Sequence, residues 1–165
     1  AGIFCHANTW AVIAECLLGR GDRAFEYYLS FLPAAKNDQA EVYTMEPYVY
    51  SQFITGKEHP CKFGRARNSW LTGTASWSFV AISQYILGVR ADYDGLVIDP
   101  CIPHNWEGYR INREFRGKKF EITVKNPKGI CKGVTRLTLN GEEITGNMIP
   151  LNKMLGHNQV EAVLE

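Results

Sequence analysis

The periodicity of apolar residues changes once along the chain, near residue 92, and this change constrains the fold more than any other feature. Before it, apolar residues recur with helical spacing, and this part holds fifteen of the twenty aromatic residues. After it, β-branched and aromatic residues alternate with polar ones, as in half-buried antiparallel strands. The sequence therefore predicts an α + β protein of two units, a helical one over 1–91 and a small antiparallel β-sandwich over 92–165.

Two helices are expected at the start of the helical unit. The first presents one apolar face, begins at Thr9 as N-cap and ends at Gly19; its face consists of Trp10, Ile13, Ala14, Leu17 and Leu18. The second runs from Asp22 to the residue before Pro33, which cannot continue a helix. Because so few residues separate them, the two helices are predicted to form an antiparallel hairpin.

The rest of the helical unit is expected to be less regular until its last helix. We predict a polar connection over 34–45, a short aromatic helix or turn over 46–55 and an irregular loop over 56–68. Residues 74–87 are apolar almost all round and stop at Gly88, which is typical of a helix buried on most faces. Such a helix needs neighbours beyond these 165 residues.

The β unit carries one strong turn signal. Asn140 and Gly141 separate two short strand patterns, and both positions of a type I′ turn require positive φ, which Asn and Gly tolerate best. Alternating patterns over 109–115, 120–124 and 160–164 supply further strands.

Composition excludes several functional classes. Eighteen Lys and Arg residues against seventeen Asp and Glu give a net charge of +1, which argues against nucleic-acid binding. No apolar run is long enough to span a bilayer, and the N-terminus lacks the pattern of a signal peptide, so we expect a cytoplasmic protein. The cysteines form no C-x-x-C pair and are expected to be reduced, mostly buried thiols rather than disulfides or zinc ligands: Cys5, Cys16, Cys61, Cys101 and Cys131.

Two places in the helical unit could bind an anion. His6 lies close to a helix N-terminus, where it could hold a phosphate or carboxylate, or could simply bond a backbone carbonyl. Thr72 and Gly73 open the apolar helix, where free N–H groups could bind an anion or be capped by a threonine hydroxyl. Arg65 and Arg67 precede this segment and could add charge or be solvated.

A further segment mixes aromatic rings with hydrogen-bonding groups. Glu46, Tyr48, Tyr50 and Gln52 are the residue types of a sugar subsite, in which apolar faces stack and hydroxyls need partners. The alternative is a buried aromatic turn whose polar groups pair with one another.

Three sequence blocks, GIFCHANTW, MEPYVYSQF and NSWLTGTASW, resemble the C-terminal part of the cellobiose phosphorylase family, the inverting β-glycoside phosphorylases. The resemblance implies that 1–91 is the end of an α/α six-hairpin barrel and that 92–165 is a jelly-roll-like sandwich. It also implies phosphate binding by His6, Thr72 and Gly73, and sugar binding by Gln52, with Glu46 and Tyr50 in the same motif.

The resemblance further implies the reaction and its participants. A β-linked glucose disaccharide is cleaved with inorganic phosphate to α-glucose 1-phosphate and glucose, without a cofactor. The catalytic general acid, an Asp, and the phosphate-binding arginines lie upstream in the family, so we expect no catalytic residue in this chain and no activity without the rest of the barrel, as a preceding part or a complementary chain. A homodimer is expected. Alternatives are a related phosphorylase for chitobiose, cellodextrin or another linkage, and a non-catalytic carbohydrate-binding or scaffold protein.

Overall fold

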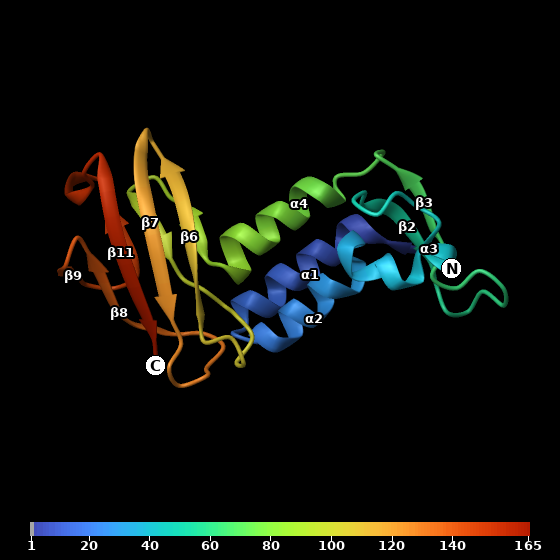
Figure 1. Ribbon diagram of the computed structural model, residues 1–165, viewed down its shortest axis with the longest axis horizontal. Coiled ribbons are helices and arrows are strands. Elements are labelled where there is room, and N and C mark those ends of the chain that lie inside the picture. The colour runs from blue at the N-terminus through green and yellow to red at the C-terminus, as the bar shows by residue number, and fades with distance from the viewer. Residues whose placement is uncertain (1) are drawn as a thin grey trace.

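The computed structural model describes residues 2–165 as a set of helices between a small sheet and a larger β region (Figure 1). The helical elements are α1 (Cys5–Leu17), α2 (Gly21–Phe31), η1 (Pro33–Gln39), α3 (Ala40–Tyr43) and α4 (Thr74–Val80), which continues as the π-helical η2 (Ala81–Ile86). The small sheet has the order β1-β2-β3, with β1 (Gly2–Phe4), β2 (Ser51–Thr55) and β3 (Ala66–Ser69). Within residues 2–165, no helix combines the length and apolar character needed to cross a membrane.

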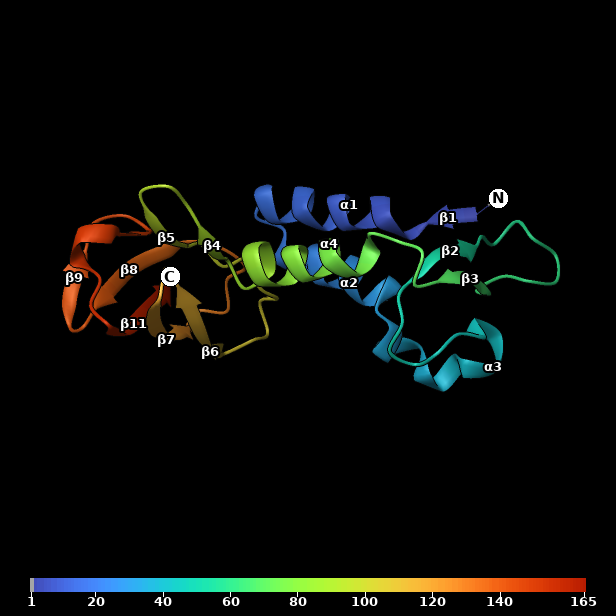
Figure 2. The ribbon, with the colours of Figure 1, turned by 90° about the horizontal axis from the view of Figure 1, so that it is seen from above.

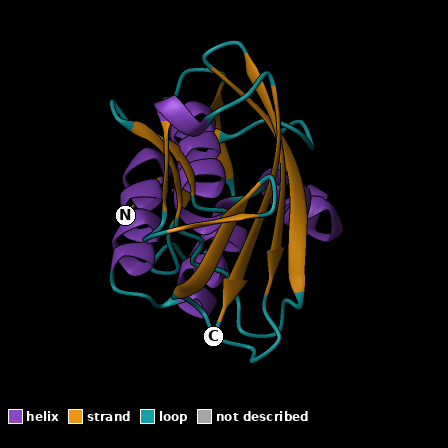
Figure 3. Cartoon of the chain, turned by 90° about the vertical axis from the view of Figure 1, so that its left-hand side faces the viewer, coloured by secondary structure: helices purple, strands orange, loops and turns teal. Residues whose placement is uncertain are grey.

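The β region contains two sheets. One has the order β10-β5-β4, from β4 (Val89–Ala91), β5 (Gly95–Ile98) and β10 (Met148–Pro150). The other has the order β6-β7-β11-β8-β9, from β6 (Gly108–Phe115), β7 (Lys118–Lys125), β8 (Val134–Leu139), β9 (Glu142–Ile144) and β11 (His157–Leu164). A short turn, η3 (Leu151–Lys153), joins β10 to the last strand. Figure 3 views the molecule from the end that carries these sheets.

The antiparallel prediction for the β region is wrong at one place, because β11 pairs with β7 in parallel, from His157↔Lys119 to Val163↔Lys125. Alternation along a strand specifies which face is buried but not the direction of its neighbour. The hairpin prediction is confirmed: Asn140 and Gly141 join β8 to β9 with φ values of 52° and 87°.

The predicted helix hairpin is present, but the first helix differs from the prediction in its start and in its buried face. Thr9 is not the N-cap, because α1 begins at Cys5 and the buried Thr9 hydroxyl donates to the His6 carbonyl, 2.7 Å away. The buried face carries small and β-branched residues, including Val12 and Cys16, whereas Trp10 is 54% exposed. Small side chains are buried because α2, α4 and η2 pack closely on that side of α1 (Figure 2).

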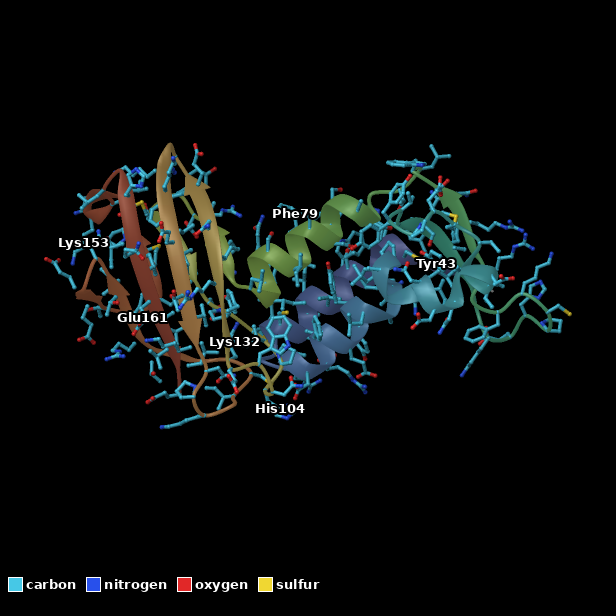
Figure 4. The ribbon with its side chains drawn as sticks, viewed as in Figure 1. Tyr43, Phe79, His104, Lys132, Lys153 and Glu161 are labelled. Carbon is cyan, nitrogen blue, oxygen red and sulfur yellow. The ribbon has the colours of Figure 1, made fainter. Side chains whose placement is uncertain are left out.

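The predicted helix over 74–87 is confirmed as α4 followed by η2, although only one of its faces is buried in the described structure. The buried residues of that face are mostly small, among them Thr74, Ser78 and Ala81, with Ile86 at the end of η2. Phe79, labelled in Figure 4, is 65% exposed. Small residues at helical spacing allow α4 and α1 to approach closely.

The irregular stretches hold more regular structure than predicted. Residues 51–55 form strand β2 rather than a helix or turn, because β1 and β3 supply partners on both sides, as in the pairs Phe4↔Phe53 and Phe53↔Arg67. The 34–45 connection contains η1 and α3, and the end of the predicted 56–68 loop forms β3. The division into units at residue 92 stays a prediction.

One buried cluster joins the helices to the two sheets of the β region. Its members include Val12 from α1, Ile86 from η2, Leu96 from β5 and Phe120 from β7. At the junction, the backbone of α2 touches that of the β region so closely that a Cβ on Gly21 would lie 2.1 Å from the Ile102 carbonyl oxygen. Polar contacts surround this point. Lys132, labelled in Figure 4, forms an ion pair with Asp99 at 3.0 Å, and its Nζ also donates to the Cys16 carbonyl, 3.4 Å away.

We predict that Gly21→Ala lowers the free energy of unfolding by about 1–3 kcal/mol, because the added methyl group must displace backbone rather than a flexible side chain. Gly156→Ala is the matched control, since nothing lies within 4 Å of its added Cβ. Urea unfolding followed by circular dichroism measures both. Equal midpoints for the two variants would contradict the close backbone contact.

A second prediction concerns Asp22, which accepts hydrogen bonds at 2.9 Å from the His104 backbone N–H and from its ring Nδ1. The backbone hydrogen bond is the main cause that lowers the pKa of Asp22 below its ordinary value. A lowered pKa stabilises the folded state above the ordinary value of 3.8, and this stabilisation is lost as the pH falls below it. Asp22→Asn should therefore cost at most about 1 kcal/mol at neutral pH, since the pair is exposed. Urea midpoints of the two proteins should converge in acid; a constant difference would contradict the pKa shift.

Candidate functional site

The structure brings His6 into direct contact with Gly73. His6 lies in the first turn of α1, directly after β1, and Gly73 is the residue that precedes α4. A Cβ on Gly73 would lie 2.7 Å from His6 Cε1 and 3.1 Å from Nδ1. Only glycine therefore allows the imidazole to lie where it does, and two of the three predicted phosphate-binding residues adjoin.

Aromatic rings hold the His6 imidazole on its other sides. Its centroid lies 5.4 Å from Trp10, 6.0 Å from Phe4 and 6.3 Å from Trp77. Trp10 and Trp77 also pack edge to face on each other, 6.2 Å apart with an interplanar angle of 88°. This geometry is favourable for aromatic pairs and restricts the orientation of the imidazole.

One nitrogen of His6 is buried and unpaired. Among the described residues, Nε2 has no hydrogen-bond partner although it is inaccessible to solvent. Buried polar atoms in folded proteins are almost always paired, so the unpaired Nε2 makes His6 a candidate to bind a ligand. An imidazole nitrogen can donate to an anion or accept from a hydroxyl.

Thr72 lies beside Gly73 and takes part in capping α4. Its Oγ1 accepts a hydrogen bond from the Thr74 N–H at 3.1 Å and lies 2.6 Å from the Thr74 hydroxyl oxygen. Gly73, the N-cap of α4, makes no side-chain cap hydrogen bond, and the Thr72 hydroxyl instead satisfies the N–H of the first helical residue. Because the Thr74 proton goes to the Ser51 carbonyl, the Thr72 hydroxyl donates to Thr74 and accepts from its N–H, and it must turn its proton away from Thr74 to donate to an anion. The N-terminus of α4 also presents N–H groups without helical partners, which favours an anion in front of it.

The predicted sugar-binding residues divide between two places. Glu46 and Gln52 lie beside β3: Glu46 Oε1 accepts from the Trp70 indole at 3.3 Å, and Gln52 Oε1 accepts from the Asn68 amide at 2.8 Å. Tyr48 packs on Trp70, with 6.3 Å between ring centroids.

Tyr50 instead lies toward the helices. Its ring packs on Phe31, with 6.4 Å between centroids, and it belongs to the residues packed against the core. Burial is the main cause that raises the pKa of the neighbouring Tyr28, and the hydrogen bond between Tyr28 and Tyr50 raises it further. The structure therefore separates Tyr50 from Glu46 and Gln52.

The candidate phosphate-binding residues and the candidate sugar-binding residues meet at Ser51. The buried Ser51 lies between Tyr50 and Gln52 in the chain, its hydroxyl lies 3.5 Å from Cys5 Sγ, and its carbonyl accepts from the Thr74 hydroxyl at 3.4 Å. His6, Gly73 and Gln52 are each next in sequence to one of these three residues. The candidate phosphate-binding and sugar-binding residues therefore occupy one end of the helices.

Sequence reasoning missed Asn68 and Trp70, which contact Gln52 and Glu46. Both have left-handed backbone, with φ of 57° and 67°. Asn often adopts this conformation, which is a weak signal, whereas nothing in the sequence indicates it for Trp. Of the two candidate arginines, Arg67 is exposed on β3, and the Nε atom of Arg65 is buried without a partner among the described residues.

No metal site or disulfide emerges from residues 2–165. Nowhere in this range do three His, Cys, Asp or Glu side chains gather in a way that could hold a metal ion. The cysteines are free, with Cys5, Cys16 and Cys101 buried, Cys131 half-buried and Cys61 exposed. The prediction of mostly buried thiols is confirmed for these residues.

Comparison with known proteins identifies the family. Residues 1–88 match the family described as "Glycosyl hydrolase 94 superfamily, catalytic domain", and residues 89–145 match "Glycosyl hydrolase family 65, C-terminal domain". The chain belongs to the glycosyl hydrolase 94 superfamily, which confirms the resemblance found in the sequence. The candidate phosphate-binding and sugar-binding residues all lie within the part that matches the catalytic domain.

Several relatives are disaccharide phosphorylases. The chain is 46% identical to an N,N'-diacetylchitobiose phosphorylase of Vibrio furnissii and 47% identical to one of Vibrio proteolyticus, in each case over 98% of this chain and 20% of the relative. It is 36% identical to a solabiose phosphorylase of Paenibacillus borealis, over 90% of this chain and 19% of the relative. The chain thus spans about a fifth of the length of these relatives.

We predict that Gly73→Ala moves the His6 ring, because the new methyl group would lie 2.7 Å from Cε1, closer than van der Waals contact allows, and the surrounding rings leave the imidazole little room. The measurement is the ¹H–¹³C NMR signal of each histidine ring. The His6 signals should shift, while those of His157, on β11, serve as the internal control and stay in place. Unchanged His6 signals would contradict the contact.

Proposed function

We propose that this chain supplies part of the phosphate site and part of the sugar site of an inverting glycoside phosphorylase. The protein would cleave a β-linked disaccharide with inorganic phosphate to an α-sugar 1-phosphate and a free sugar. His6, Thr72 and Gly73 would bind phosphate. Gln52 and Glu46 would bind sugar, and Tyr50 would belong to the same sugar site from its position toward the helices. The observation that carries this proposal is the buried, unpaired Nε2 of His6 beside Gly73 at the N-terminus of α4.

The chemistry fits these residues because phosphate is itself an anionic nucleophile. An inverting glycosidase needs one carboxyl group as acid and a second to activate water, and phosphate removes the need for the second. The protein must then hold phosphate on the face of the sugar opposite to the leaving oxygen, which His6, Thr72 and the N–H groups of α4 are suited to do. Protonation of the leaving oxygen needs a general acid, which we assign to an Asp elsewhere in the barrel. No cofactor is proposed.

The identity of the disaccharide is a choice between two sugars. The residues of the sequence blocks favour a disaccharide of glucose, and cellobiose is the corresponding substrate. The two Vibrio relatives, which share 46% and 47% identity, act on N,N'-diacetylchitobiose, whereas the solabiose phosphorylase shares 36%. We therefore propose that both disaccharides be assayed with phosphate, and that N,N'-diacetylchitobiose be the first.

The finer architecture and setting are also proposals. Residues 1–91 would complete an α/α six-hairpin barrel, residues 92–165 would form a jelly-roll-like sandwich, and the whole protein would be a cytoplasmic homodimer. A matching family model over 1–88 and the two sheets that follow Ile86 support the first two. The alternative of a non-catalytic carbohydrate-binding protein would be favoured by several exposed aromatic rings on the β region. Among the described residues of that region, only the Tyr93 ring is largely exposed.

We predict that His6→Ala and Thr72→Val, made in the active protein that contains this chain, each raise KM for phosphate about tenfold or more, because each removes a hydrogen bond to a charged ligand. KM for the disaccharide should change far less. His157→Ala on β11 is the control and should leave both constants unchanged. Equal effects of His6→Ala and Thr72→Val on both substrates, or no effect, would contradict the phosphate role.

A further inference from the structure

The segment between β3 and α4 contains two residues in an unusual backbone conformation. Asn68 and Trp70 both have left-handed φ, 57° and 67°, and Trp70 is also 69% exposed. A bulky non-glycine residue in this region costs free energy, and such strain persists where surrounding contacts impose it. An exposed tryptophan gains little from burial here, so its strained backbone requires another explanation.

The strained backbone directs both side chains at the candidate sugar-binding residues. The Asn68 amide nitrogen donates to Gln52 Oε1 at 2.8 Å, and the Trp70 indole nitrogen donates to Glu46 Oε1 at 3.3 Å. Each bond engages one oxygen of its acceptor. An amide with its oxygen engaged offers its NH₂ group as a donor, and a carboxylate with one oxygen engaged offers the other as an acceptor.

We propose that Asn68 and Trp70 are positioning residues of the sugar site: they orient Gln52 as a hydrogen-bond donor and Glu46 as an acceptor toward sugar hydroxyls. This inference rests on the proposed function, because it concerns the same site. Sugar hydroxyls both donate and accept, so a site that presents one donor and one acceptor in fixed orientation selects the hydroxyl pattern of its ligand. The Tyr48 and Trp70 rings, 6.3 Å apart, add apolar faces next to these groups.

The test compares variants of Asn68 in the active protein that contains this chain. Asn68→Asp keeps the size and the tolerance of left-handed backbone but replaces the donor by an acceptor, so Gln52 must turn its NH₂ group away from the sugar. We expect KM for the disaccharide to rise about tenfold, with KM for phosphate unchanged. Asn68→Gly keeps the backbone conformation and leaves Gln52 free, and should have a smaller effect in the same direction.

The two constants separate positioning from a general structural role. The same segment leads directly into Thr72 and Gly73, so a variant that merely disturbed its backbone would raise KM for phosphate as well. An unchanged KM for the disaccharide in Asn68→Asp, or an equal rise in both constants, would overturn the inference.

The proposed function and this inference can fail separately. Absence of phosphorolysis by the unsubstituted protein would contradict the proposed function. Titration calorimetry with the disaccharide then still tests the inference, since Asn68→Asp should weaken binding about tenfold, and an equal Kd for both proteins would overturn it. Trp70→Phe, which keeps the ring and removes only the indole N–H, should weaken binding in the same assay because it frees Glu46.

Discussion

The candidate site depends on the hydrogen bonds made by Ser51, a buried residue at the start of β2. Its hydroxyl lies 3.5 Å from Cys5 Sγ and accepts from the Tyr43 hydroxyl at 3.4 Å, and its carbonyl accepts from the Thr74 hydroxyl at 3.4 Å. Burial raises the pKa of the Cys5 thiol, which keeps it neutral and suited to this contact. One serine thus links the starts of α1 and α4 and the end of α3 to the small sheet.

These links give the site its geometry. The start of α1 brings His6, the start of α4 brings Gly73, and β2 brings Gln52. Because a Cβ at position 73 would overlap the imidazole, glycine there allows the helix starts to approach. At the other end of the same helices, the β region holds η2 and α2 through the Cys101 N–H to the Ile86 carbonyl, 2.9 Å, and the Gly21 contact. The helices are therefore anchored at both ends.

Prediction succeeded where a few neighbouring residues decide the outcome. Helix α2 follows from its apolar spacing and from Pro33, and the β8–β9 turn follows from the positive φ that Asn140 and Gly141 tolerate. It failed for β2, because the aromatic segment 46–55 suits a turn equally well and the strand depends on pairing with β1 and β3, which lie elsewhere in the chain. It failed for Thr9 because α1 already begins at Cys5, so that the Thr9 hydroxyl lies inside the helix and donates to the His6 carbonyl instead of capping.

By itself the sequence determined the helix hairpin, the tight turn in the β region, the family and the residue types of the site. Each of these follows from residues close together in the chain, through apolar periodicity, turn residues or a short sequence block. Tertiary structure alone decided that the His6 ring lies on Gly73 with an unpaired nitrogen, that β11 runs parallel to β7, and that Asn68 and Trp70 adopt strained backbone to reach Gln52 and Glu46. The physical reason is that each of these features needs contacts between segments far apart in the chain, whose cost in loop entropy is repaid only when the whole core forms.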